Sequence, residues 1–242
     1  DKASVEVARR QYALDIRRKR NVILSNLRFE HFASRIDHGA VMIGDRETKD
    51  PDTLTNVTIE NCDFTWNNAN GLELQRCLGL ALRNCTATYN GFGGLTVGGG
   101  YNHLVDDVTL NFNGWRAGWA SHGAWAHGGA KIARTLHAVY RNIEAVGNNA
   151  PGFWFDIDNR NIVIDNLTVL GSRPFGLFFE ISPGPFYVRN AAVGGVRNFD
   201  GRKAEDVRIA EATAVTIEDS TVTLDPEVDV VYGVQGRRKG GW

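Results

Sequence analysis

The chain has 242 residues, enough to bury a substantial core, and 27 Lys and Arg against 28 Asp and Glu give a formal net charge of −1. This balance provides no overall field to attract nucleic acid or acidic lipid, and no apolar run approaches the roughly 18–20 residues of a membrane span. Three cysteines are too few for a disulfide scaffold or a zinc module. We therefore expect neither a nucleic-acid nor a membrane partner.

A repeated pattern, apolar-x-apolar-x-Asn, runs along the chain from VILSN onward. In chain order its last position is Asn26, Asn61, Asn84, Asp107, Asn142, Asn166, Asn190 and Asp219, at intervals of 35, 23, 23, 35, 24, 24 and 29. Short apolar runs that open with Gly71, Gly94, Gly129, Gly152 and Gly176 follow intervals of 23, 35, 23 and 24. Because both series share the base period and a 12-residue excess, the repeat is real.

Each unit holds short strands of period two, such as VTIE, GLEL and GFWF, separated by Gly and Asn, with no sustained helical period. Units of 22–24 residues with several strands are typical of one coil of a parallel β-solenoid. A leucine-rich repeat would need a fixed leucine pattern and a helical half, and neither is visible. We predict an all-β parallel β-helix of about eight coils over residues 1–225, with a loop insertion near 111–128 and a C-terminal tail over 226–242.

The segment YALDIRRKRN before the first unit is interpreted as an incomplete first coil. Solenoid ends need caps, and no amphipathic helix precedes this segment. We therefore expect a further domain or another chain to cap the N-terminal end, as in a fragment of a larger protein.

The Asn series and the coil period resemble those of the right-handed parallel β-helix proteins, the pectate-lyase-like superfamily, over about residues 20–225. The resemblance implies a right-handed fold, a polysaccharide or oligosaccharide partner, and a secreted, periplasmic or cell-surface location. GFWFDIDN and GLFFEIS are similar to a motif of bacterial β-helix carbohydrate-active enzymes. The Asn-Thr-Asp and Asp-Asp motifs of the polygalacturonase branch are missing, and SHGAW only faintly resembles its Gly-His-Gly. No residue role is carried over from that branch.

The period also places side chains on the two faces of the glycine-led strands. Alternation directs apolar residues inward and leaves two outward columns. The first column is Glu73, Thr96, Lys131, Trp154 and Phe178, and the second is Gln75, Gly98, Ala133, Asp156 and Glu180. Asp156 and Glu180 are thus expected on successive coils, about 4.7–4.9 Å apart at the backbone, where joint ionisation is disfavoured. Trp154 and Phe178 are expected to be exposed beside them.

Asp156 and Glu180 are the first candidates for catalysis, with Asp158 and Lys131 as further candidates. Asp158 is as readily a turn cap, and Lys131 more often a salt-bridge partner than a base. The alternative interpretation of the two acids is a solvated face on which they pair with Arg160 or Arg134. Candidate substrate-binding residues come from the outward column and from the insertion, where aromatic rings can stack on sugars. They are Trp154, Phe178, Glu73, Arg116, Trp119, His122, Trp125 and His127.

The leading functional hypothesis is a glycoside hydrolase that uses the paired carboxylates and no cofactor. The first alternative is a polysaccharide lyase, in which Asp156, Asp158 and Glu180 hold Ca²⁺ against a uronate and Lys131 abstracts a proton. The second is a non-catalytic glycan-binding or structural solenoid.

Two further expectations concern packing. Cys62 and Cys85 lie 23 residues apart and are expected to be packed thiols on neighbouring coils. Asn84 and Asn166, although in glycosylation sequons, are expected to be buried ladder residues.

Overall fold

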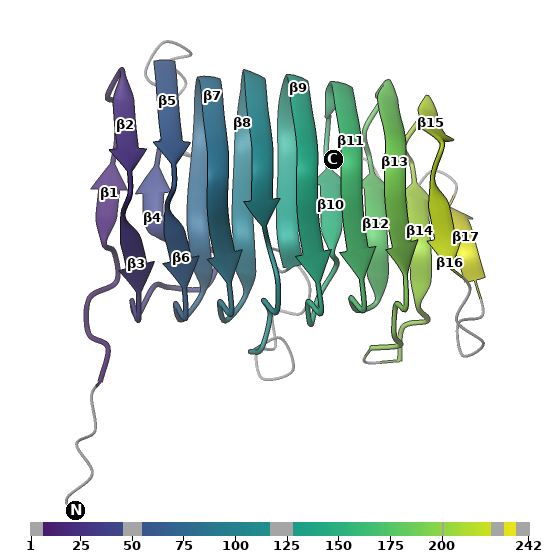
Figure 1. The fold of residues 1–242 in the computed structure, drawn as a ribbon, viewed down its shortest axis with the longest axis horizontal. Coiled ribbons are helices and arrows are strands. Elements are labelled where there is room, and N and C mark those ends of the chain that lie inside the picture. Colours follow the sequence, from purple (N-terminus) through teal and green to yellow (C-terminus); the bar gives the residue numbers. More distant parts are fainter. Residues whose placement is uncertain (1–6, 46–54, 117–127, 200, 224–229, 236–242) are drawn as a thin grey trace, which may run out of the picture.

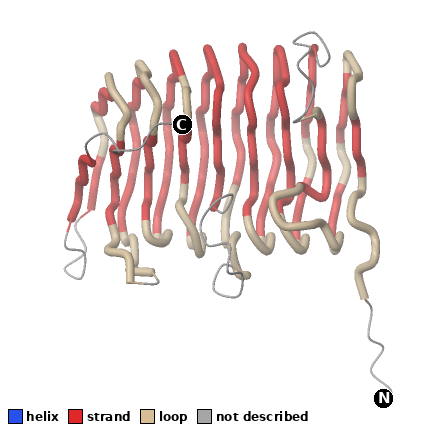
Figure 2. The backbone as a smooth tube through the Cα atoms, turned by 180° about the vertical axis from the view of Figure 1, so that it is seen from behind, coloured by secondary structure: helices blue, strands red, loops and turns tan. Residues whose placement is uncertain are grey.

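The computed structural model describes residues 7–45, 55–116, 128–199, 201–223 and 230–235. In these ranges the chain forms strands and no helix, and the strands join in one parallel, 17-stranded arrangement. Figure 1 shows the coils stacked side by side along the long axis, and Figure 2 shows tan turns linking the red strands at the coil corners. Within the described residues, no helix is long and apolar enough to cross a membrane.

The strands, in chain order, are β1 (Leu14–Ile16), β2 (Val22–Ser25), β3 (Arg28–Glu30), β4 (Gly39–Ile43), β5 (Thr55–Glu60), β6 (Asp63–Thr65), β7 (Asn70–Thr88), β8 (Gly93–Thr109), β9 (Gly128–Val146), β10 (Phe153–Asp156), β11 (Arg160–Leu170), β12 (Phe175–Glu180), β13 (Phe186–Gly194), β14 (Glu205–Ala210), β15 (Val215–Glu218), β16 (Thr221–Thr223) and β17 (Val230–Gln235).

These strands form eight coils and the start of a ninth. The first two coils are β1–β3 and β4–β6, and β7, β8 and β9 each span most of one coil. The pairs β10 with β11 and β12 with β13 make the next two, followed by β14–β16. The predicted all-β parallel β-helix of about eight coils is confirmed. β17 pairs with β14, so the paired solenoid continues into the segment for which the sequence predicts only a tail.

The core fills the inside of the coils. The inward residues of the glycine-led strands are buried in it as predicted, including Leu74, Val97, Ile132, Phe155 and Phe179. Phe155 and Phe179 lie in register on neighbouring coils, and their rings stack with centroids 5.6 Å apart. Apolar area removed from water along such columns is the main stabilising contribution to the fold.

The predicted Asn series lies at corners where the backbone is left-handed. Asn84 and Asn166 have φ of 48° and 57°, a region that Asn tolerates better than most residues. Their side-chain amides donate to Asn61 Oδ1 (2.7 Å) and Asn142 Oδ1 (2.8 Å) on the preceding coil. Both residues are nevertheless exposed, so the expectation that they are buried was wrong. The left-handed corner directs these side chains outward rather than into the core.

A second Asn series, which the sequence reasoning missed, is fully buried at another corner. Asn67, Asn90, Asn113 and Asn148 are 0% exposed, at intervals of 23, 23 and 35. Asn90 Oδ1 accepts from the backbone N–H and side-chain amide of Asn67, and Asn90 Nδ2 donates to Phe64 O and Asn113 Oδ1. The same pattern continues to Asn148. This buried ladder satisfies the backbone where the chain bends.

The cysteines confirm the packing expectation. Cys62, Cys77 and Cys85 are all free and buried. Burial raises the pKa of the Cys77 and Cys85 thiols to about 12, so neither is a reactive thiolate at neutral pH.

Candidate active site on the outer face of the glycine-led strands

Two carboxylates lie side by side on the outer face of β10 and β12. These strands are parallel, and their register pairs Asp156 directly with Glu180. Each residue is only 6% exposed. The predicted adjacency of the acids is confirmed, and both side chains are more enclosed than on a solvated face.

Lys131 of β9 provides the positive charge for this pair. Its Nζ lies 2.9 Å from Asp156 Oδ2 and 3.8 Å from the centroid of the Trp154 ring. The ammonium therefore makes an ion pair and a cation–π contact within one buried cluster. The interpretation of Lys131 as a salt-bridge partner is confirmed.

Aromatic side chains form a second apolar cluster outside the core. The rings of Trp154 and Phe178 stack with centroids 5.3 Å apart and planes inclined by 16°. Phe175 packs against Phe178, and the Arg208 guanidinium lies over both Phe rings, 4.7 and 5.7 Å from their centroids. Trp154 is 7% and Phe178 4% exposed, so the expectation of exposed rings was wrong. Cations and neighbouring rings cover the Trp154 and Phe178 side chains, although the alternation of side chains along a strand alone would direct them to solvent.

Two buried polar atoms of the Asp156 strand lack hydrogen-bond partners within the described part of the chain. They are Asp156 Oδ1 and Trp154 Nε1. Buried polar atoms in native proteins are nearly always paired, and exceptions need an explanation such as a bound ligand or water. One acceptor and one donor are thus available beside the acid pair.

Glu73 lies on the same face, two coils before Lys131 with Thr96 between them. Its side chain is fully buried and accepts from Gly39 N and Gln75 Nε2, both at 3.0 Å. His38 Nδ1 approaches the same carboxylate at 3.4 Å. Glu73 is thus held by its own neighbours and extends the charged face away from Asp156.

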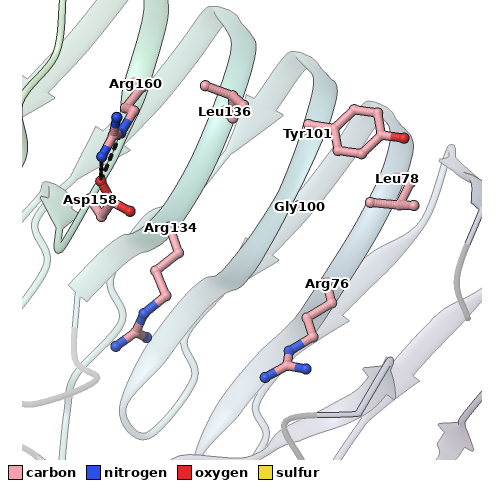
Figure 3. A pocket seen from close by; sticks show the side chains of 8 residues that line it. All are labelled: Arg76, Leu78, Gly100, Tyr101, Arg134, Leu136, Asp158 and Arg160. Atoms are coloured by element: carbon pink, nitrogen blue, oxygen red, sulfur yellow. Dashed lines mark hydrogen bonds and ion pairs between the residues drawn. The ribbon is translucent and has the colours of Figure 1, made fainter. Parts of the chain in front are cut away.

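Asp158 lies across a corner from the acid pair. Its side chain is 53% exposed and forms an ion pair with Arg160 at 2.8 Å. The two residues line a hollow of about 380 Å³ together with Arg76, Leu78, Gly100, Tyr101, Arg134 and Leu136 (Figure 3). The carboxylate of Asp158 is therefore directed to this hollow, whereas Asp156 is paired with Lys131. Arg160, considered above as a partner of the acid pair, binds Asp158 instead.

Arg116 is the one predicted insertion residue that the structure describes. Its guanidinium lies over the Phe92 ring, 5.7 Å from the centroid, and donates to the side chain of Asn68. It thus packs near the corner that precedes the glycine-led strands. The other four, Trp119, His122, Trp125 and His127, lie outside the described residues.

The described residues contain no group of three His, Cys, Asp or Glu side chains arranged to hold a metal ion. The three acids of the calcium hypothesis are divided by the corner, with Asp156 on the buried face and Asp158 in the hollow.

Sequence reasoning missed Glu205 and Arg208 of β14. Arg208 pairs in register with Phe178, and its guanidinium donates to Glu205. Glycine marks the earlier strands, but Asp206 stands where Gly176 stands one coil before. The 29-residue interval between Asn190 and Asp219 was the available signal for this coil.

The fold and this face define a parallel β-helix with a buried, charged outer cluster. The family model described as "Right handed beta helix region" matches residues 51–199, and the chain belongs to this family. No curated protein matches the chain.

Among solved structures, the Agl-KA catalytic domain is 13% identical, with a TM-score of 0.42, over 89% of this chain and 47% of that one. This chain thus spans about half the length of that domain. QnrB1, a plasmid-mediated fluoroquinolone resistance protein, is 10% identical (TM-score 0.27; 89% and 90% covered). HetL, a pentapeptide repeat protein from Nostoc sp. strain PCC 7120, is 8% identical (TM-score 0.25; 88% and 90% covered). At these scores the likenesses carry no argument about function.

Proposed function

We propose that the protein is a glycoside hydrolase that cleaves a polysaccharide or oligosaccharide with Asp156 and Glu180. The observation that carries this proposal is the register of β10 and β12, which sets the two carboxylates on adjacent coils of one face. Glycoside hydrolysis needs one carboxyl group as proton donor and one carboxylate as nucleophile or base.

The surroundings suggest how the two roles divide. Lys131 Nζ contacts Asp156 Oδ2 at 2.9 Å, and a carboxylate held in place by an ammonium group suits the role of nucleophile or base. Glu180 then serves as the proton donor to the leaving oxygen. Two acids with different environments and different roles are the general arrangement in this chemistry.

Enclosure sets a condition on the mechanism. Both carboxylates are 6% exposed, so the glycan must displace the side chains that cover the outer face when it binds. Asp156 Oδ1 and Trp154 Nε1, buried without partners among the described residues, then provide an acceptor and a donor for sugar hydroxyls.

The test is the formation of new reducing ends from a panel of plant, algal and bacterial polysaccharides. We expect Asp156→Asn and Glu180→Gln each to lower turnover at least ~100-fold, the lower range for losing a positioned acid or base. Asp107→Asn is the matched control, because this exposed acid lies at a corner where the neighbouring coils carry Asn, and it should retain most activity. Equal turnover by wild type and both pair variants would refute the assignment. Retained binding without any turnover by wild type would instead indicate a glycan-binding solenoid.

A further inference from the structure

The hollow beyond the acid pair is lined by two arginines that flank a glycine on the coil between them. Arg76 and Arg134 both have φ of 54°, and Gly99 holds the corresponding position on the coil between them. A Cβ placed on Gly99 would lie 3.7 Å from Arg76 Cγ and 4.0 Å from Arg134 Cβ. The arginines are thus two coils apart, about 9.6 Å at the backbone, and the glycine between them contributes no side chain. Figure 3 shows both side chains extending in the same direction.

The charge of this hollow is not balanced by the residues that line it. Three arginines face a single aspartate, Asp158, which is already paired with Arg160 at 2.8 Å. Arg76 and Arg134 form no ion pair within the described ranges. Planar guanidinium groups bind carboxylate and sulfate oxygens in bidentate fashion, so the pair suits a ligand with anionic groups.

An aromatic ring in the same hollow points to a saccharide rather than a bare anion. Tyr101 is 43% exposed, and its ring contacts no other aromatic ring in the described part of the chain. The exposed rings of Trp66, Tyr89 and Phe112 differ, because they stack on one another at 4.7 and 5.0 Å and cover their own faces. Tyr101 lies between Leu78 and Leu136 of the neighbouring coils and leaves part of its ring exposed, which suits contact with the apolar face of a sugar ring.

We propose that this hollow is a subsite for an acidic saccharide. Arg76 and Arg134 bind its carboxylate or sulfate groups, and Tyr101 packs against a sugar ring. The inference rests on the proposed function and deepens it, because the hollow adjoins the acid pair. Ala133 pairs in register with Asp156, and the next residue, Arg134, donates its backbone N–H to Ile157 O at 2.7 Å. One glycan chain can thus extend from the carboxylates across the corner.

The test is calorimetric binding to the full chain carrying Glu180→Gln, which prevents turnover from consuming the ligand. The probes are uronate-containing, sulfated and neutral oligosaccharides of equal length, and inorganic sulfate. Arg76→Gln combined with Arg134→Gln should weaken binding of an acidic oligosaccharide about 10- to 100-fold and leave neutral ones unchanged. Added salt should weaken the acidic complex. Tyr101→Ala should weaken it by a smaller factor.

Arg20→Gln combined with Arg35→Gln is the matched control, since both arginines are exposed and lie outside the hollow. Unchanged affinity in the Arg76 and Arg134 double variant would overturn the proposal, as would equal affinity for neutral and acidic oligosaccharides. Sulfate binding as tight as saccharide binding would also overturn it, by showing a simple anion site. Acidic glycan binding that needs these arginines, without turnover by wild type, would uphold the subsite and refute the hydrolase.

Discussion

At the residue scale, the corners of the coils require particular side chains, and Asn90 of the buried ladder is an example. Asn90 is 0% exposed and its side chain contacts coils on both sides. Removing it leaves Asn67 N and Phe64 O buried without these partners, and it leaves Asn67 Nδ2 with Phe29 O as its remaining acceptor. An unsatisfied buried polar group costs about 1–3 kcal/mol.

We therefore expect Asn90→Ala to lower the free energy of unfolding by roughly 3 kcal/mol or more, measured by urea denaturation. Asn84→Gly is the control, because it keeps the left-handed corner and loses one exposed hydrogen bond. Its cost should be about 1 kcal/mol or less. A similar loss of unfolding free energy in the two variants would show that the buried ladder contributes no more to stability than an exposed corner Asn.

A second residue-scale prediction concerns His103, which is 2% exposed and contacts Cys77 O through Nε2 at 2.8 Å. Burial lowers its pKa in the folded state below the ordinary value of about 6.5. Below that pH the unfolded chain takes up a proton that the folded chain resists. The folded state thus loses up to about 1.4 kcal/mol per pH unit as the pH falls.

The measurement is the free energy of unfolding from pH 8 to pH 5, in wild type and His103→Gln. The variant should show a flatter slope below pH 6.5, whatever its absolute stability. Parallel slopes would contradict the prediction.

At the element scale, side chains aligned in columns along successive coils interact with one another from strand to strand. One exposed column alternates strictly in charge along successive coils: Glu60, Arg83, Asp106, Arg141, Asp165, Arg189 and Glu218. Hydrogen bonding to Arg141 lowers the pKa of Asp106, and Arg189 does the same for Asp165. These residues directly precede the Asn series, and opposite charges on adjacent strands stabilise the pairing.

We expect Arg141→Glu to lower the melting temperature at low salt, because it places carboxylates on three successive coils. High salt should reduce the loss, since screening shortens electrostatic interactions to about 3 Å at 1 M. Arg35→Glu, an equal charge change outside the column, is the control. The stabilising role of the charged column would be contradicted if Arg141→Glu lowered the melting temperature no more than this control, or if its effect were insensitive to salt.

At the scale of the whole molecule, the period allowed the fold and the columns to be predicted. Each coil repeats one pattern, so the register that brings Asp156 beside Glu180 follows from spacing alone. The buried ladder could also have been predicted from the sequence, because Asn67 and Asn90 follow the same 23-residue interval.

The burial of side chains on the outer face and the position of Asp158 could not be predicted from the sequence. Trp154 and Phe178 are covered by Lys131 and Arg208, and the coil that holds Arg208 lacks the marking glycine. The corner after Asp156 has one residue more than the corner after Ala133 in the preceding coil, so spacing by twos fails there. Such local insertions are visible only once the strands on both sides are aligned.

The most direct test of the central claim is the mass of the products formed by wild-type protein in ¹⁸O-labelled water. Catalysis by the Asp156 and Glu180 pair predicts that each cleaved bond takes up one labelled water, with its ¹⁸O at the new reducing end, and that Asp156→Asn and Glu180→Gln form no such products. Unsaturated products without added water would contradict hydrolysis and point to β-elimination instead.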